Sequence, residues 1–245
     1  MKTMNRIAAF ALTACLAAGA SAQGFRQFTI EGGLADGSIK HIKEGPSKVE
    51  VIAGKDVDLK KVKCKYRLLS GCTLENGLDK DFTRPQTIKV NKNDGTSKDW
   101  EITVKKINPA PLPLNLKFTE ENPAVWTPET QGWVNAGTDE GKPMVVRFGN
   151  HGVSFIAAYE GEAKEVSFQL YLVGKDGDTF GGKFQVLTST DGLAWTDLEG
   201  FDGQLTIEKR RTITCALPAD ARYIKWLYVT RDGKQNVNLN NISVK

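Results

Sequence analysis

Histidine is scarce in this chain of 245 residues, and its scarcity excludes one kind of site and restricts another. The histidines are His41 and His151, so a His-rich metal site cannot be built, and a Ser-His-Asp triad would have to use one of them. Neither lies in a recognisable nucleophile motif, and the G-x-S-x-G pattern of many hydrolases does not occur. Glycosidase chemistry needs only two facing carboxylates, and residues 108–245 contain 17 Asp and Glu. The composition leaves a glycoside hydrolase open, although no catalytic residue stands out.

Long apolar runs are missing beyond the first 22 residues, so we expect no later segment to span a membrane as a helix. Residues 1–22 are typical of an export signal peptide, with a basic start, a short apolar run and the A-x-A cleavage site Ala20-Ser21-Ala22. An alternative is a lipoprotein signal, because Leu12-Thr13-Ala14-Cys15 resembles the bacterial lipobox, in which the cysteine is lipidated. We expect a periplasmic, cell-surface or secreted protein, with a lipid anchor at Cys15 as the alternative.

A strong charge of one sign is also absent. The formal net charge is +4, and it falls to +2 without Lys2 and Arg6, so no overall field attracts nucleic acid. The run Lys60–Arg67 alternates basic with less polar residues and predicts a cationic stripe on one face of a strand. The stripe is typical of an edge strand that lysines protect from pairing, and polyanion binding is the alternative. We expect no nucleic-acid partner.

Cysteine is rare and, outside the export signal, odd in number: Cys64, Cys72 and Cys215. An exported chain meets oxidising conditions, so one disulfide could form, and an odd count leaves at least one free thiol. We expect three small, buried hydrophobic residues, with a Cys64–Cys72 disulfide as the alternative.

Proline is dense in one place, the segment Asn108-Pro-Ala-Pro-Leu-Pro113. Such a segment favours an extended linker, and we place a domain boundary over 108–113. The charge balance changes there, since residues 24–107 contain 17 Lys+Arg and 12 Asp+Glu, whereas residues 108–245 contain 14 and 17. We therefore predict two domains, 24–107 and 114–245.

The first domain shows short alternating runs and no helical period, which predicts a small β-sandwich. The expected strands are 25–30, 48–52, 62–68, 87–90 and 100–104, with a turn at Asn93-Asp94-Gly95. The motifs Lys55-Asp-Val-Asp-Leu59, Pro85-Gln-Thr-Ile-Lys-Val90, Asp94-Gly95-Thr96 and Trp100-Glu-Ile-Thr-Val104 resemble the immunoglobulin-like modules at the N-termini of exported Bacteroidetes surface proteins. The resemblance implies a spacer or platform without catalytic residues.

The second domain shows many short strands and no helical pattern, which predicts a jelly-roll β-sandwich. Its clearest element is the hairpin 184–198, with a type I′ turn at Asp191-Gly192 and a second strand that carries Trp195. We expect Phe184, Trp195 and Trp226 in the core. Residues 223–229 are apolar on nearly both faces and should form a central strand.

The stretches 184–198, 217–226 and 236–244 resemble the jelly-roll domains of Bacteroidetes exported proteins and carbohydrate-binding modules. Relatives of this kind often hold a structural Ca²⁺ through carbonyls and an acidic residue of the last strand. Here Asn240 and Asn241 stand where Asp is usual, so they are weak calcium candidates, because Ca²⁺ prefers several anionic oxygens. No other cofactor is expected.

Aromatic residues give the best indication of a ligand site, because a sugar can stack on a ring while polar neighbours bind its hydroxyls. Trp126 and Trp133 lie in 120–142, a loop by composition, although they could instead cover the sandwich edge. Polar candidates near strand ends are Arg147, His151, Arg231, Asn236 and Asn238. We expect non-catalytic binding of a poly- or oligosaccharide. The alternatives are an adhesion or assembly scaffold for another envelope protein, and a glycoside hydrolase.

Overall fold

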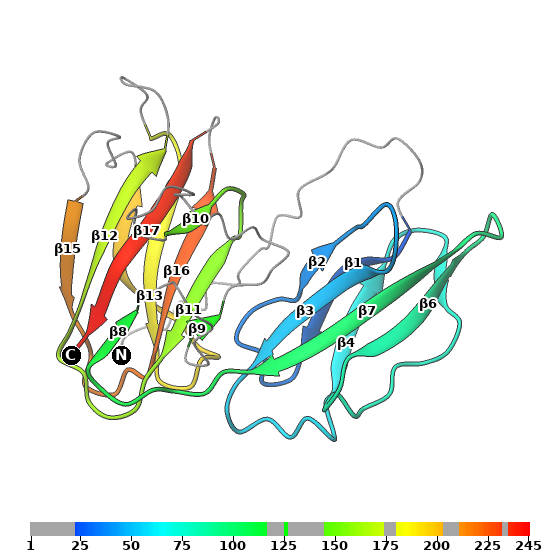
Figure 1. The fold of residues 1–245 in the computed structure, drawn as a ribbon, viewed down its shortest axis with the longest axis horizontal. Helices are drawn as coiled ribbons and strands as arrows, with labels where there is room; N and C mark the ends of the chain where they lie inside the picture. Colours follow the sequence, from blue (N-terminus) through cyan, green and yellow to red (C-terminus); the bar gives the residue numbers. More distant parts are fainter. Residues whose placement is uncertain (1–22, 117–124, 127–144, 174–179, 203–210, 232–234) are drawn as a thin grey trace, which may run out of the picture.

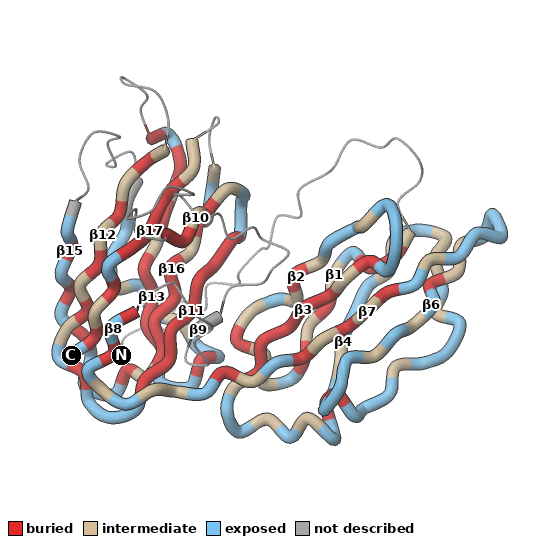
Figure 2. Tube along the Cα trace, in the orientation of Figure 1, coloured by how far each residue is buried: buried red, intermediate tan, exposed pale blue. Residues whose placement is uncertain are grey.

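The computed structural model of this chain describes residues 23–116, 125–126, 145–173, 180–202, 211–231 and 235–245. These residues form seventeen β-strands and no helix, so none of them can make a helical membrane span. The strands build two sandwiches that lie next to each other, with buried residues concentrated in the inner strands of each (Figures 1 and 2). The predicted all-β class, built from β-sandwiches, is confirmed.

The N-terminal sandwich combines a two-stranded and a five-stranded sheet. The small sheet pairs β1 (Phe25–Ile30) with β4 (Cys64–Leu68). The large sheet has the order β2-β3-β7-β6-β5, with β2 (Ser38–Lys40), β3 (Ser47–Ala53), β5 (Cys72–Leu74), β6 (Gln86–Lys92) and β7 (Ser97–Lys106). Strands β3 and β7 are parallel, and the other described pairs are antiparallel. Trp100 of β7 is fully buried in the core between the two sheets.

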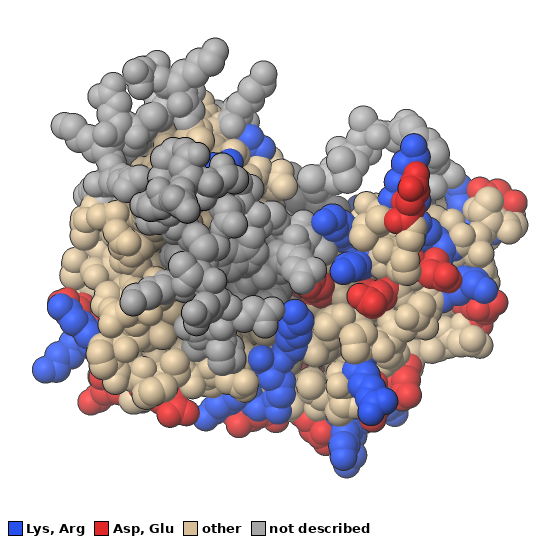
Figure 3. Space-filling view, viewed as in Figure 1, with Lys and Arg blue, Asp and Glu red and all other residues tan. Residues whose placement is uncertain are grey.

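Of the basic run 60–67, only Lys65 and Arg67 lie on β4, which pairs on one side with β1, because the strand begins at Cys64 and not at the predicted residue 62. The cations of this run are exposed, and Lys63 forms an ion pair with Glu31 at 2.9 Å. Exposed pairs of this kind contribute little to stability. On the face of the molecule shown in Figure 3, basic and acidic side chains intermingle over the N-terminal sandwich. Over the N-terminal sandwich, this view shows no large patch of one sign.

The C-terminal sandwich has two five-stranded sheets. Sheet one has the order β10-β17-β12-β15, with β8 also paired to β17; its strands are β8 (Leu114–Leu116), β10 (Val146–Phe148), β12 (Glu165–Val173), β15 (Arg211–Ala216) and β17 (Asn236–Val244). Sheet two has the order β14-β13-β16-β11-β9; its strands are β9 (Val125–Trp126), β11 (Ser154–Ala158), β13 (Lys183–Ser189), β14 (Thr196–Asp202) and β16 (Tyr223–Thr230). Strand β16 is central in sheet two, as predicted.

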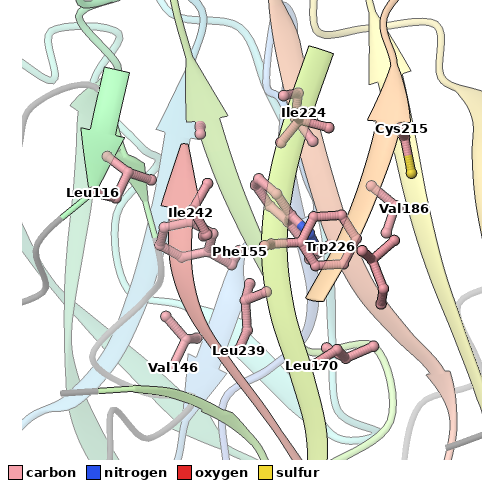
Figure 4. Close-up of a cluster of buried hydrophobic side chains, with 14 of the residues drawn as sticks. Leu116, Val146, Phe155, Leu170, Val186, Cys215, Ile224, Trp226, Leu239 and Ile242 are labelled. Atoms are coloured by element: carbon pink, nitrogen blue, oxygen red, sulfur yellow. The ribbon is translucent and has the colours of Figure 1, made fainter. Parts of the chain in front are cut away.

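The inward faces of the two sheets share one apolar core (Figure 4). Sheet one contributes Leu170 and Leu239, and sheet two contributes Phe155 and Trp226, which alternation along each strand turns inward. Trp226 packs edge-on against Phe168 of sheet one, with ring centroids 5.7 Å apart. Trp226 and Phe184 are fully buried, so both are core residues as predicted.

The hairpin of β13 and β14 is confirmed, but its predicted type I′ turn is wrong. The connection runs over 190–195, and positive φ occurs at Gly192 (+76°) but not at Asp191. The Asp191 carboxylate instead accepts hydrogen bonds from the backbone N–H groups of Leu193 and Ala194 at 2.8 and 3.0 Å. These bonds hold the pKa of Asp191 below its usual range. An Asp side chain that closes the loop in this way competes with a tight two-residue turn.

A third apolar cluster joins the two sandwiches. The N-terminal side supplies Leu34, Ile52 and Ile107, and sheet two supplies outward residues of β11 and β16: Ile156, Ala158 and Tyr223. Trp195 packs against this cluster, so its predicted place in the sandwich core is wrong. Residues 223–229 are apolar on both faces because one face meets the core and the other meets the N-terminal sandwich.

Lys225 adds a polar contact to this junction. It is 9 % exposed, its Nζ donates to the Leu34 carbonyl oxygen at 3.0 Å, and the same Nζ lies 3.8 Å from the centroid of the Trp195 ring. Burial lowers the pKa of Lys225 to about 8. At neutral pH the ammonium form therefore still predominates, and it satisfies both contacts.

The Pro-rich segment 108–113 is hydrogen-bonded to sheet two. The Ala110 N–H donates to the Ala158 carbonyl at 3.2 Å, and the Glu160 N–H donates to the Ala110 carbonyl at 2.8 Å. The domain limits placed at this segment stay a prediction.

The three cysteines of the described chain are free thiols, so the alternative of a Cys64–Cys72 disulfide is not realised. Cys215 is buried as expected, whereas Cys64 and Cys72 are half-buried. Burial raises the pKa of Cys64 to about 11.

Candidate ligand-binding face

The outward side of sheet one is lined by polar side chains. Val237 and Leu239 of β17 point into the core, so the residues that alternate with them, Asn236, Asn238 and Asn240, point outward. The same alternation turns Gln169 and Tyr171 of β12 outward. We call this surface the polar face and define it by Arg147, Gln169, Tyr171, Thr212, Asn236, Asn238 and Asn240.

Strand register arranges these side chains in two cross-strand rows. In one row, Arg147 of β10 lies opposite Asn238, which lies opposite Tyr171. In the other row, Asn240 lies opposite Gln169, which lies opposite Thr212 of β15. Directly opposed side chains on one face are close enough to interact. The polar face is therefore continuous over four strands.

Two hydrogen bonds join side chains of the polar face to each other, and a third joins the face to Asn241. Arg147 Nε donates to Asn238 Oδ1 at 3.4 Å, and Gln169 Nε2 donates to Thr212 Oγ1 at 3.2 Å. Asn241 sits at a bulge of β17 with φ +49°, and its Nδ2 donates to Gln169 Oε1 at 2.9 Å. Arg147, Gln169 and Tyr171 are half-buried, so solvent reaches part of each.

Asn240 is the most unusual residue of the polar face. It is 1 % exposed, and neither its Oδ1 nor its Nδ2 has a hydrogen-bond partner among the residues that the structure describes. Its neighbour Asn238 is 2 % exposed but bonds to Arg147. An unsatisfied buried polar group costs about 1–3 kcal/mol, and native proteins contain few of them. A ligand that supplies the missing partner would explain why this amide is there.

A second group of predicted residues meets at one end of the sandwich. The Arg231 backbone N–H donates to His151 Nδ1 at 2.8 Å, Arg231 Nε donates to the Gln235 carbonyl at 3.1 Å, and Arg231 Nη1 donates to the Gly149 carbonyl. These bonds tie the turn after β10 to the end of β16 and the start of β17. Arg231 is thus occupied by the backbone, which indicates a structural role.

The polar candidates predicted from sequence divide between these two places. Arg147, Asn236 and Asn238 share the polar face, and His151 and Arg231 bond to each other. The prediction of a loop at Trp126 is wrong, because its backbone forms β9 in sheet two, opposite Ile156. Trp133 and Cys15 lie outside the described residues.

Sequence reasoning missed Gln169, Tyr171 and Thr212 as members of the face. The alternation of 166–173 shows that Gln169 and Tyr171 share one side of their strand. What the sequence lacks is the register that sets Tyr171 beside Asn238 and Gln169 beside Asn240.

The described donors do not fit a calcium site at Asn240 and Asn241. Within the described ranges, no three His, Cys, Asp or Glu side chains gather as metal ligands. The polar face supplies amide and hydroxyl oxygens without a carboxylate, whereas Ca²⁺ prefers anionic oxygens. We assign no binding step to calcium.

Comparison with known proteins shows that the chain is similar in fold to several solved structures. No protein-family model and no curated protein matches the chain. Among solved structures, a candidate glycoside hydrolase of Bacteroides thetaiotaomicron is 8 % identical with a TM-score of 0.48, over 95 % of this chain and 99 % of that one. The K1 cleaved adhesin domain of Lys-gingipain from Porphyromonas gingivalis is 18 % identical with a TM-score of 0.40, over 54 % and 96 %. A family 29 carbohydrate-binding module, solved with mannohexaose, is 10 % identical with a TM-score of 0.30, over 42 % and 71 %. The chain is a β-sandwich protein with structural similarity to these three kinds of protein.

Proposed function

We propose that the C-terminal sandwich binds a poly- or oligosaccharide on its polar face and does not cleave it. One observation carries this proposal: Asn240 is buried in a row of outward polar side chains, and its amide oxygen and nitrogen both lack a partner. Sugar hydroxyls suit such a group, because each hydroxyl donates and accepts hydrogen bonds as an amide does.

The composition of the polar face supports binding over catalysis. Its seven defining residues include three asparagines, a glutamine, a threonine, a tyrosine and an arginine, which bind hydroxyls but do not form an acid–base pair. Glycoside hydrolysis by the usual route needs two carboxyl groups that flank the bond, and none of the seven residues carries one.

The proposed place of action is outside the cytoplasm. Residues 1–22 support export, either by cleavage after Ala22 or by lipidation at Cys15. The mass of the mature N-terminus distinguishes the two, because a chain starting at Gln23 and a lipidated chain starting at Cys15 differ in length and modification. A mass that still includes residues 1–22 would contradict export.

A glycan array probed with residues 23–245, with calcium and again with a chelator, tests the binding proposal. We expect a specific hit whose affinity is unchanged by the chelator and falls at least tenfold in Asn240→Ala. The matched control is Asn76→Ala, which removes an exposed asparagine of the N-terminal sandwich and should bind like the parent.

Two outcomes would overturn the proposal. A blank array across plant, host and bacterial glycans would favour the alternative of an adhesion or assembly scaffold, to be pursued with pull-downs from envelope extract. Release of shorter products from a polysaccharide panel would show a glycoside hydrolase.

A further inference from the structure

Arg147 is the one charged residue of the polar face, and it has no counter-ion among the described residues. It is half-buried in β10, where Val146 and Phe148 on either side are anchored in the core. Its Nε–H bonds to the neutral amide oxygen of Asn238. Its two terminal nitrogens have no hydrogen-bond or ion-pair partner in the described part of the chain.

The nearest acidic residue along the adjacent strands of the same outward side is remote. Glu165 begins β12, six residues before Tyr171, which places it about 20 Å along the strand from the row of Arg147. Glu165 is also paired with Lys245, with a distance of 3.1 Å between the charged atoms. It cannot neutralise Arg147.

A half-buried guanidinium without a counter-ion is costly, because a charge that leaves water needs a compensating group. Arginine also presents a planar fork of donors that matches a carboxylate with two parallel hydrogen bonds. Here Nε donates to Asn238, and among the described residues nothing takes up the terminal nitrogens, which leaves them to bind a ligand. The geometry therefore favours an anionic, planar group on the ligand.

We infer that the polar face selects glycans that carry uronic acids. The ligand carboxylate pairs with the terminal nitrogens of Arg147, and its hydroxyls bind to Tyr171 and the neighbouring amides. This inference rests on the proposed function and adds the class of sugar. Arg231 is not a candidate for the same role, because its guanidinium donates to the backbone carbonyls of Gln235 and Gly149.

The test compares three polymers by titration calorimetry with residues 23–245: polygalacturonate, the same polymer with its carboxyl groups reduced, and a sulfated galactan. We expect polygalacturonate to bind at least tenfold more tightly than the reduced polymer and the sulfated galactan. Arg147→Gln should lose that preference and keep the weaker affinity for the reduced polymer. Arg147→Lys keeps the charge without the fork, so we expect it to retain only part of the preference.

Arg67→Gln is the matched control, because Arg67 is an exposed arginine of the N-terminal sandwich. Equal losses in Arg147→Gln and Arg67→Gln would show non-specific attraction and overturn the inference. Equal affinity for the acidic and the reduced polymer would also overturn it, while leaving glycan binding intact. Tighter binding of the sulfated galactan would refute the carboxylate assignment. If none of the polymers binds and the glycan array is blank as well, it is the proposed function that fails.

Discussion

The loop of the β13–β14 hairpin makes contact with the N-terminal sandwich, and a single methyl group tests that contact. Gly192 has φ +76°, and a Cβ added there would lie 2.2 Å from Leu34 Cδ2. Leu34 is 2 % exposed and belongs to the cluster between the sandwiches. Gly192→Ala therefore strains its own backbone and collides with a residue of the other sandwich.

The magnitude of each part follows from the structure. An alanine in the left-handed region costs about 1–2 kcal/mol. A methyl group forced against packed Leu34 costs about 1–3 kcal/mol more, because the core around it must shift. We expect Gly192→Ala to lower the free energy of unfolding by about 2–5 kcal/mol.

Gly152→Ala is the matched control. Gly152 has φ +72° in the same sandwich, and an added Cβ meets no atom within 4 Å. It should show the backbone part alone, about 1–2 kcal/mol. The difference between the two variants then measures the collision with Leu34.

Urea unfolding followed by tryptophan fluorescence gives these values, and a double-mutant cycle assigns the partner. Leu34→Ala alone leaves a cavity and costs about 2–5 kcal/mol. In that background Gly192→Ala should cost no more than Gly152→Ala does, because the colliding side chain is gone. Equal losses for Gly192→Ala and Gly152→Ala in the parent would refute the packing of the loop against Leu34.

Two further substitutions test the polar face and the junction. Asn240→Leu should raise the free energy of unfolding by about 1–2 kcal/mol, because it removes two unpaired buried polar atoms. The same substitution should abolish glycan binding. A lower free energy of unfolding in urea would mean that the amide has a partner. Lys225 has a folded pKa of about 8, below its ordinary 10.5. The unfolded chain thus keeps a proton that the folded chain loses, and the contribution of Lys225 to stability should rise between pH 8 and 10 by up to about 1.4 kcal/mol per unit. Lys225→Met should flatten that rise, and an unchanged slope would count against a buried Lys225.

Strand positions could be predicted from sequence because alternation along a strand is a local property. Strands β1 and β16 begin at the predicted residues, and β3, β4, β6 and β7 begin within three residues of the predicted starts, whereas β2 and β5 were not predicted. The hairpin was predicted correctly too, but its turn was not. An Asp-Gly pair is compatible with several loops, and the bonds from Asp191 to Leu193 and Ala194 decide between them.

The sequence does not predict which residues pack against each face of a strand, because those residues are distant along the chain. The pattern of 223–229 shows two apolar faces, but it does not show that the second face meets Leu34 and Ile52 of the other sandwich. Trp195 was assigned to the core for the same reason. The polar face could not be predicted for the same reason. Arg147 and Tyr171 lie near each other only because strand register places both opposite Asn238.

The two sheets of the C-terminal sandwich differ in what their outward sides do. The outward side of sheet two is apolar at Ile156, Ala158 and Tyr223, and the N-terminal sandwich covers it there. Gly192 and Trp195 of the hairpin loop also pack against this contact region, Gly192 next to Leu34 and Trp195 against the apolar cluster. The N-terminal sandwich therefore occupies the surface on which the loop could have met a ligand. We therefore place the proposed ligand site on sheet one, where the amide of Asn240 has no hydrogen-bond partner among the described residues.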